Sequence, residues 1–302
     1  MAPKGPEAES PSPTNGSVRK RTEALSPSLP RKKTPPLSKL LNRSSIILSI
    51  LHKMLPDYVF WISFGLDTRK QRRRSIPLVM HKRRRRRRIL PFNPTEDPVR
   101  RFEQMGSLAT ALTTLQMEFS NELTYMAGMA PRSANQAILE KGGMQVLPRE
   151  DKETLKLCRA MYKRGECPPL LVVYDSLEGF TVQADGHLKD MTFIAEYTGD
   201  VDYLLNRQHD DCDSIMTLLS ATNPSDSLVV CPDKRGNIAR FINGINNHNQ
   251  ESRKKQNIKC VRYDVDGECR ALLVACRDIA CGERLYYDYN GCEQEYPTQH
   301  FI

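Results

Sequence analysis

The nine cysteines of this 302-residue chain are the residues most able to bind a metal ion or to form disulfide bonds. All lie in the second half of the sequence, their number is odd, and no Cys-x-x-Cys pair is present. The two closest, Cys276 and Cys281, are separated by four residues. Together with the lack of an export signal, this pattern indicates a reducing intracellular compartment. We therefore expect buried, apolar cysteines and no metal site.

Four short stretches combine glycine with glutamate, arginine, asparagine and tyrosine. A glycine lets backbone approach a ligand closely, and a buried tyrosine joins an apolar body to a hydroxyl that either packs or orients a reacting group. No Gly-x-Gly-x-x-Gly is present, which argues against a Rossmann-type fold. In chain order the stretches are Glu178-Gly179-Phe180-Thr181, Glu196-Tyr197-Thr198-Gly199, Arg240-Phe241-Ile242-Asn243 and Gly282-Glu283-Arg284-Leu285-Tyr286-Tyr287-Asp288-Tyr289.

In this order and spacing the stretches resemble the SET family of protein lysine methyltransferases. They correspond to its Gly-Trp-Gly-like turn, its Glu-Tyr-x-Gly strand, the start of its Arg-Phe-Ile-Asn-His-Ser segment and its Gly-Glu-Glu-Leu-x-Tyr/Phe-Asp-Tyr ending. Three departures stand out: Thr181 replaces the second glycine of the turn, Gly244-Ile245 replace His-Ser, and the Cys-x-Cys zinc tail of many members is missing.

Within the family, residues 89–302 resemble the plant trithorax-related group that monomethylates lysine 27 of histone H3. The similarity includes Asp200-Val201-Asp202-Tyr203 and the segment Glu295-Tyr296-Pro297-Thr298-Gln299-His300-Phe301. Members of that group usually carry a zinc-binding PHD finger and a clamp-binding peptide before the SET domain. Neither pattern is found here, because no Cys/His cluster precedes Cys158.

The resemblance implies S-adenosylmethionine as the methyl donor and a substrate lysine that enters a narrow channel from the opposite face. Tyr289 aligns with the family's catalytic tyrosine, Tyr197 lines the same channel, and Tyr287 stands where tyrosine usually limits the product to monomethyl-lysine. Asp288 is expected to be a structural acceptor. The residues implied to contact the donor are Glu178, Gly179, Phe180, Arg240, Phe241, Ile242, Asn243, Gly244 and Tyr289.

Hydrophobic periodicity predicts the elements that position these residues. Asp97-Pro98 resembles a helix start, and an apolar stripe at helical spacing follows. A second helix is expected at residues 149–163, and Asp266-Gly267 predicts a hairpin turn. The stripe comprises Met105, Leu108, Leu112, Leu115, Phe119 and Leu123, and the expected strands are Leu170–Tyr174, Phe180–Ala184, Met191–Tyr197, Leu228–Cys231, Ile258–Val265 and Cys269–Cys276. These elements predict a mainly β fold with peripheral helices, and the family resemblance implies the SET fold of short-strand sheets with a C-terminal pseudoknot.

Charge divides the chain near residue 95. Residues 1–95 hold 22 of the 45 Lys and Arg but 5 of the 36 Asp and Glu, a net charge of +17, whereas the remainder carries −8. We expect residues 1–95 to form a largely disordered basic arm, residues 96–165 a helical segment packed on the catalytic domain, and residues 166–302 the SET domain. The run Lys82 to Arg88 is interpreted as a nuclear localisation signal or phosphate-binding patch, with a solubilising run as the alternative.

Residues 44–66 contain two apolar runs, Ile46–Leu51 and Val59–Ile62, interrupted by His52, Lys53 and Pro56-Asp57. The interruptions leave no continuous membrane span of about 20 residues. A short partner-binding or amphipathic element is the favoured interpretation.

The family resemblance implies a heterochromatin-associated chromatin regulator that methylates histone H3, and the basic run agrees with a nuclear location. The expected partners are the histone H3 tail or nucleosome and, through the basic arm, non-specific nucleic acid; no membrane contact is expected. Two alternatives stay open. One is a catalytically inactive SET-like module that binds histone or acts as a scaffold, and the other is a nucleic-acid-tethered factor whose function resides in the arm.

Overall fold

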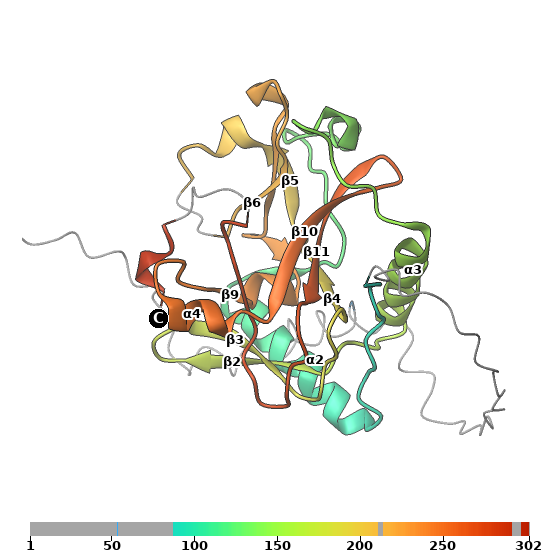
Figure 1. Cartoon of the computed structure of the whole chain (residues 1–302), viewed down its shortest axis with the longest axis vertical. Helices are drawn as coiled ribbons and strands as arrows, with labels where there is room; N and C mark the ends of the chain where they lie inside the picture. The colour runs from blue at the N-terminus through green and yellow to red at the C-terminus, as the bar shows by residue number, and fades with distance from the viewer. Residues whose placement is uncertain (1–52, 54–86, 211–213, 292–296, 302) are drawn as a thin grey trace, which may run out of the picture. The chain divides into compact units, whose positions relative to one another are not determined.

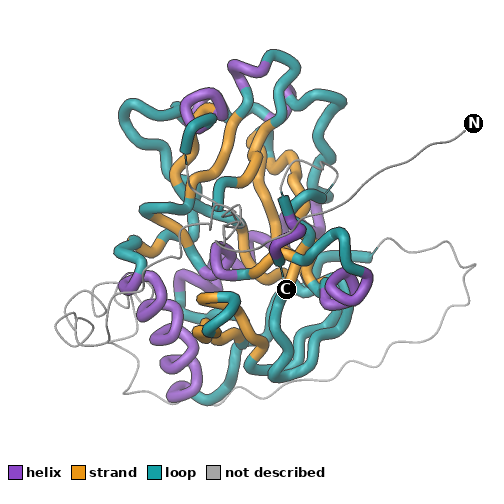
Figure 2. Tube along the Cα trace, turned by 90° about the vertical axis from the view of Figure 1, so that its left-hand side faces the viewer, coloured by secondary structure: helices purple, strands orange, loops and turns teal. Residues whose placement is uncertain are grey.

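Figure 1 shows the computed structural model of the chain, which describes Lys53 and residues 87–210, 214–291 and 297–301. The rest of the apolar stretch at 44–66 and residues 82–86 of the basic run lie outside this part. Figures 1 and 2 show strands in the interior with helices at their margins. The predicted fold class is thereby confirmed. Across the described residues, we find no helix with the length and hydropathy of a membrane span.

The first long helix, α2 (Pro98–Thr114), begins where the sequence predicts, because the Asp97 carboxylate accepts a hydrogen bond from the Val99 amide. The expectation that its apolar stripe continues through Phe119 and Leu123 is wrong. Gln116 adopts a φ of 61°, which no helix can accommodate. Phe119 instead belongs to β1 (Glu118–Phe119), which pairs in parallel with β8 (Arg235–Gly236).

The second long helix, α3 (Arg149–Lys163), has the predicted bounds. It buries Leu155, Cys158 and Met161 on one face, at the three-residue spacing that an α-helix brings together. On the same helix the Tyr162 hydroxyl donates to the Ile194 carbonyl oxygen at 2.7 Å. Helix α3 is therefore attached to the strand that contains Ile194. The short α4 (Gln250–Lys255) and the 3-10 helices η4 (Arg132–Ala134), η5 (Ala137–Leu139), η6 (Leu204–Arg207), η7 (Pro224–Asp226), η8 (Ile238–Phe241) and η9 (Thr298–His300) complete the described helices.

The strands form small sheets rather than one continuous sheet. Within the described residues the strand orders are β1-β8, β2-β3, β5-β7-β6, β10-β11-β4 and β12-β9. The strands not yet delimited are β2 (Leu170–Asp175), β3 (Gly179–Ala184), β4 (Phe193–Glu196), β5 (Asp200–Tyr203), β6 (Met216–Leu219), β7 (Leu228–Cys231), β9 (Asn243–Gly244), β10 (Ile258–Val265), β11 (Glu268–Ala275) and β12 (Tyr286–Tyr287).

Strand β11 is buried on both faces, which explains its nearly continuous apolar sequence. Leu272 and Val274 pack in the cluster beneath α3, whereas Ala271, Leu273 and Ala275 belong to the larger cluster on the other face. Alternate side chains of a strand point to opposite faces, so β11 joins the two cores. The β10–β11 turn contains Asp266 and Gly267 at φ values of 56° and 91°, as the predicted hairpin requires.

The predicted strands are present, with small differences at their ends. Strand β4 begins at Phe193 and not at Met191, because Met191 adopts a φ of 69°. Sequence analysis missed β5 and β6, which flank β7 in an antiparallel sheet. It also missed the two-residue strands β1, β8, β9 and β12, which are too short to show any alternation.

Residues 87–95 belong to the folded body, so the expected arm boundary at residue 95 falls too late. Ile89 and Phe92 are 4% and 1% exposed and lie in the cluster beneath α3. The Ile89 amide donates to the Asp151 carboxylate at 3.1 Å, and Leu90 forms an isolated parallel β-bridge with Thr192. Apolar burial outweighs the local charge of Arg87 and Arg88, which pair with Asp190 and Glu150 at the surface.

Truncation of Phe92 should therefore destabilise the domain. We expect Phe92→Ala to lower the free energy of unfolding by about 3–5 kcal/mol through loss of buried area and a residual cavity. Phe102→Ala is the matched control, because Phe102 is 51% exposed and should change stability by about 0.5 kcal/mol or less. Urea denaturation followed by circular dichroism measures both, and equal effects would contradict the assignment of residues 87–95 to the core.

Candidate active site

The parallel pair of β9 and β12 brings together two of the four stretches that sequence analysis singled out. Asn243 lies opposite Tyr286 and Gly244 opposite Tyr287. The Ile245 amide then donates to the Tyr287 carbonyl oxygen at 3.0 Å, which extends the pairing by one residue. Residues more than 40 positions apart in sequence are thus held side by side.

Tyr289 packs directly against this pair. Its hydroxyl donates to the Ile242 carbonyl oxygen at 2.9 Å, and its ring lies 4.7 Å from that of Tyr287 between centroids. The ring of Phe301 meets Tyr289 edge-on at 5.3 Å. A Cβ on Gly244 would come within 3.0 Å of the Tyr289 ring and 2.5 Å of Phe301. Gly244 is therefore required for the aromatic ring to sit so close to the backbone.

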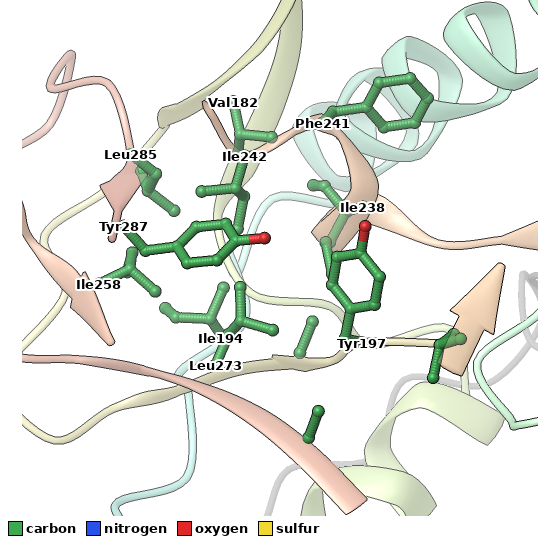
Figure 3. Packing of buried hydrophobic residues seen from close by; sticks show 14 of the residues in the cluster. Val182, Ile194, Tyr197, Ile238, Phe241, Ile242, Ile258, Leu273, Leu285 and Tyr287 are labelled. Atoms are coloured by element: carbon green, nitrogen blue, oxygen red, sulfur yellow. The ribbon is translucent and has the colours of Figure 1, made fainter. Parts of the chain in front are cut away.

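Tyr197 approaches the same region from β4. Its side chain is buried, and its hydroxyl donates to the Ser214 carbonyl oxygen at 2.6 Å. Figure 3 shows Tyr197 and Tyr287 in one apolar cluster, with the hydroxyl of Tyr197 directed toward Ile238 and Phe241. The structure thus places Tyr197, Tyr287 and Tyr289 around a common apolar region.

A buried ionic network fixes the strand end that carries Tyr197. The preceding residue, Glu196, is 5% exposed and accepts hydrogen bonds from Arg159 at 2.7 Å and Arg270 at 3.0 Å. Charge-assisted bonds of this kind compensate the carboxylate for its burial. They tie β4 to α3 on one side and to β11 on the other, so Tyr197 has little freedom to move.

Glu178 connects the first stretch to the β9–β12 pair through its side chain. Its carboxylate accepts from the Asn243 amide nitrogen at 3.2 Å and from the Tyr286 hydroxyl at 3.0 Å, and it lies 3.3 Å from the Arg284 guanidinium. Burial, together with the adjacent Glu178 charge, raises the pKa of Tyr286. Because the Asn243 nitrogen is held by Glu178, the amide oxygen is the atom left to face a ligand.

The turn before β3 is braced by Asp175. Its carboxylate accepts from the amides of Glu178 at 3.0 Å and Leu177 at 2.7 Å, and it pairs with Arg284 at 2.7 Å. These bonds lower the pKa of Asp175 to about 2. Gly179 follows with a φ of 76°, and nothing lies within 4 Å of the position where its Cβ would be. The turn thus combines a rigid base with open space above Gly179.

Among the other residues predicted to contact the methyl donor, Phe180 and Phe241 form an aromatic support for that turn. Phe180 packs edge-on against Phe241 at 5.9 Å, and the Arg240 guanidinium lies 5.8 Å from the Phe241 ring centre. Arg240 also donates to the Pro232 carbonyl oxygen at 2.9 Å. Since Phe241 and Ile242 are almost fully buried, their side chains belong to the core, and only backbone at these positions can face a ligand.

Asn257 is a positioning residue that sequence analysis missed. It is fully buried, its side chain donates to the Arg284 carbonyl oxygen at 2.7 Å, and it accepts from the Tyr286 amide at 2.9 Å. Its backbone amide donates to the Tyr286 carbonyl oxygen as well. An asparagine that precedes a strand carries no signal of such a long-range contact, so only the structure shows it.

The predicted structural role of Asp288 agrees with its contacts. It accepts from the Asn247 side chain at 2.8 Å and from the Asn290 amide at 3.0 Å. Asn246 donates in turn to the carbonyl oxygens of Gln299 and Phe301. These bonds hold the C-terminal segment over Gly244 and Tyr289.

One departure from the SET pattern, Thr181, has a local explanation. Thr181 lies in the β2–β3 hairpin opposite Val173 and is 1% exposed, so a β-branched residue suits this strand position.

The predicted burial of the cysteines holds for Cys158, Cys231 and Cys269 but is wrong for Cys281, which is exposed. Among the residues that the structure describes, no group of histidine, cysteine and acidic side chains could hold a metal ion.

Two cavities of about 40 and 230 Å³ lie elsewhere, where Phe119, Asn121 and Tyr162 line both. Neither includes Gly179, Asn243 or Tyr289. The site is therefore assigned from the contacts among the four stretches and not from cavity size.

Comparison with known proteins shows which family the chain resembles. The family described as SET domain matches residues 179–290. A probable histone-lysine N-methyltransferase ATXR5 of Ricinus communis is 73% identical over 78% of this chain, and histone-lysine N-methyltransferase ATXR5 of Arabidopsis thaliana is 68% identical over the same share. The matched region spans only 63% and 62% of the length of these two relatives.

Solved structures give the same likeness. A crystal structure of ATXR5 in complex with histone H3.1 mono-methylated on an arginine is 74% identical, with a TM-score of 0.70. The match covers 71% of this chain and all of that one. A structure of the ATXR5 SET domain in complex with histone H3 di-methylated on an arginine has the same identity, score and coverage.

A methyl group added at Gly244 should disturb the aromatic packing of the site. We expect Gly244→Ala to destabilise the domain by about 1–3 kcal/mol, because its Cβ would collide with Phe301 and Tyr289. Gly106→Ala is the control: Gly106 lies in α2 with nothing within 4 Å of its Cβ position, so alanine should stabilise by about 0.5–1 kcal/mol. Thermal melting compares the two, and an unchanged melting temperature for Gly244→Ala would refute the close approach.

Proposed function

This chain belongs to the SET-domain family, and from that membership we propose that it transfers a methyl group from S-adenosylmethionine to a lysine side chain of histone H3. The observation that carries the proposal is the β9–β12 pairing, which sets the Asn243-Gly244 backbone beside Tyr287 and Tyr289. One side of this pair meets the Glu178–Phe180 turn, and the other meets the tyrosine-lined apolar region. A donor site and an acceptor site would thereby share one wall.

The residues at the Glu178–Phe180 turn suit a donor with a positively charged methionine part and a flat adenosine. Gly179 offers open space where a side chain would otherwise stand, and Phe180 offers an aromatic surface. The Asn243 amide oxygen and the backbone of Gly244 would complete the site. When bound, the donor supplies an electrophilic methyl group on sulfur. The contribution of the protein is to hold that methyl in line with the substrate nitrogen.

Tyr289, Tyr197 and Tyr287 would line the acceptor channel. The Tyr289 hydroxyl donates a hydrogen bond to the Ile242 carbonyl oxygen, so its own oxygen would accept from the lysine amine and orient it. An apolar channel also disfavours the charged ammonium, which lowers the pKa of the entering lysine. The lysine proton leaves to solvent before transfer, and the neutral nitrogen lone pair then forms the new N–C bond as the donor's S–C bond breaks.

The proposed substrate is lysine 27 of histone H3, converted to its monomethyl form. The names of the relatives and the histone H3 complexes of the ATXR5 structures support a lysine of histone H3, whereas the choice of lysine 27 and of one methyl group follows from the resemblance to the plant trithorax-related group. The proposed location is the nucleus, at heterochromatin. Residues 166–302 would form the catalytic domain, residues 96–165 its helical flank, and the basic arm a non-specific contact to nucleic acid.

Mass spectrometry of nucleosomes incubated with the full chain and S-adenosylmethionine tests the activity. We expect one methyl group on lysine 27 of histone H3. Methylation of a different protein, or binding of histone H3 with no methyl transfer, would overturn the proposal, and the second result would identify an inactive histone-binding module.

Removal of the Tyr289 hydroxyl should slow the reaction selectively. We expect Tyr289→Phe to lower kcat by about a hundred- to a thousandfold, the usual effect of losing one oriented hydrogen-bonding group at the transition state. Donor affinity, measured by calorimetry, should be nearly unchanged. Tyr203→Phe on β5 is the control for loss of a phenol hydroxyl elsewhere. A kcat for Tyr289→Phe within twofold of the parent would exclude the catalytic role.

The number of methyl groups transferred should depend on Tyr287. Its hydroxyl can anchor a water molecule beside the substrate amine, in the volume that a first methyl group must occupy during a second transfer. Without the hydroxyl this water is held weakly, and its displacement by an apolar methyl becomes favourable. We expect Tyr287→Phe to add di- or trimethyl-lysine, as read by mass spectrometry. Abundant trimethyl-lysine from the parent, or an unchanged product distribution in the variant, would contradict this role.

A further inference from the structure

Helix α3 carries a face made entirely of basic side chains, of which Arg159 alone supports the proposed active site, through Glu196. The residues are Arg149, Lys152, Lys156, Arg159 and Lys163, and we refer to them as the α3 basic face. Their spacing of three and four residues places them within an arc of ~80° on a helix of 3.6 residues per turn. The buried residues of α3 lie on the opposite side, so this face points away from the core. In Figure 1, α3 lies at the outer side of the β10–β11 hairpin.

The α3 basic face keeps unneutralised charge. Lys156 and Lys163 are exposed, and neither has an ion-pair partner within the described part of the chain. The Arg149 side chain is 91% exposed and makes only a 3.4 Å contact with Glu153. An exposed pair of that kind contributes little and releases its arginine readily to another anion.

Two carboxylates partly neutralise the positive charge of the α3 basic face. Asp266, in the β10–β11 turn, lies 2.8 Å from the Lys152 amine, and the neighbouring Lys156 and Arg159 also help to lower its pKa. Glu196 is buried and binds Arg159. Lys152 and Arg159 therefore form ion pairs within the domain, whereas Arg149, Lys156 and Lys163 can bind an external anion.

Arg88, the last residue of the N-terminal arginine run, contacts the first turn of α3. Arg88 contacts Glu150 at 3.3 Å, the Ile89 amide donates to Asp151, and the Thr154 hydroxyl donates to the Ile89 carbonyl oxygen. These contacts hold Arg88 at the N-terminal end of α3, on the side of the helix that carries Glu150 and Asp151 and not on the α3 basic face.

We propose that the α3 basic face binds the phosphate backbone of duplex DNA. The face is ~21 Å long at 1.5 Å per residue, which matches about six nucleotide steps of a DNA strand at 3.4 Å each. Lysines and arginines with no base-reading pattern suit phosphate contacts without sequence preference. A histone tail on a nucleosome lies beside wrapped DNA, so a DNA-binding face on the same domain would hold the enzyme next to its substrate.

Binding of a labelled 30-base-pair duplex to the full chain, measured by fluorescence anisotropy across a range of salt concentrations, tests the proposal. The variant K156A/K163A should bind on the order of tenfold or more weakly at 0.1 M salt, and its plot of log K against log salt should be less steep by ~1.8, because each phosphate contact contributes ~0.9 to the slope. The arginine run stays in both proteins, so the difference reports the α3 basic face.

Two further variants distinguish DNA binding by the α3 basic face from an effect of the total charge of the protein. K141A/K254A removes the same charge from exposed lysines outside α3, and its salt dependence should match that of the parent. Asp266→Asn keeps a residue that tolerates the φ of 56° and frees Lys152, so it should tighten DNA binding several-fold. Circular dichroism melting checks that each variant is folded.

Three outcomes would overturn the proposal. The first is a K156A/K163A slope equal to that of K141A/K254A, and the second is weaker binding by Asp266→Asn. The third is displacement of the labelled duplex by polyglutamate or single-stranded RNA as effectively as by unlabelled duplex at equal charge. Because DNA binding is measured directly, these results do not depend on methyl transfer. Methylation of a free histone H3 peptide by K156A/K163A should remain at the parent rate, whereas methylation of nucleosomes should fall.

Discussion

The parallel pairing of β9 with β12 is the contact on which the candidate site depends. Two residues on each strand would not hold each other unaided, because so short a ladder offers few hydrogen bonds. Asn257 supplies the missing support by bonding residues 284 and 286 with its side chain and residue 286 again with its backbone. Its complete burial removes competition from water, so these bonds are stronger than they would be at the surface.

From this pairing follows the close approach of Tyr289 to the backbone. The Tyr289 hydroxyl can reach the Ile242 carbonyl only because Gly244 has no side chain, and Phe301 packs edge-on against the Tyr289 ring and also against Gly244. The glycine that replaces histidine in the SET pattern is thus matched by an aromatic residue about 60 positions later. Seen alone, Gly244 is a departure from the family pattern; in the structure it is half of a compensating pair.

Electrostatics organise the rest of the domain around two carboxylates, the partly buried Glu178 and the buried Glu196. Glu178 binds the side chains of Asn243, Tyr286 and Arg284, and Glu196 pairs with Arg159 and Arg270. Each cluster joins elements that are distant in sequence, and each adjoins a residue proposed to act on donor or substrate. A buried carboxylate is costly without partners, so these contacts fix the geometry of the site as well as contribute to stability. Five basic side chains, Arg159 among them, share one face of α3.

Local patterns in the sequence determined the elements that are long or have strong end signals. Helix α3, the strands β7 and β10 and the Asp266-Gly267 turn were predicted with their bounds, because helical periodicity, apolar runs and turn residues act within a few positions of one another. The motif stretches containing Gly179, Tyr197, Asn243 and Tyr289 were also found, since each is continuous in sequence. Where α2 ends and where the folded body begins were predicted wrongly, because long-range burial and pairing decide both.

Only the tertiary structure decided how those stretches meet. Nothing local to Asn257 indicates that it holds residues 284–286, and a two-residue strand such as β9 has no periodicity to detect. The side-chain role of Glu178, the fit of Gly244 beneath Tyr289 and the docking of Ile89 and Phe92 likewise depend on contacts across tens of residues. Sequence patterns do not predict these contacts because of the range of the interactions. Residue type and spacing predict hydrogen bonds and burial only within a turn or a strand. Contacts between distant segments are selected by packing of the whole core.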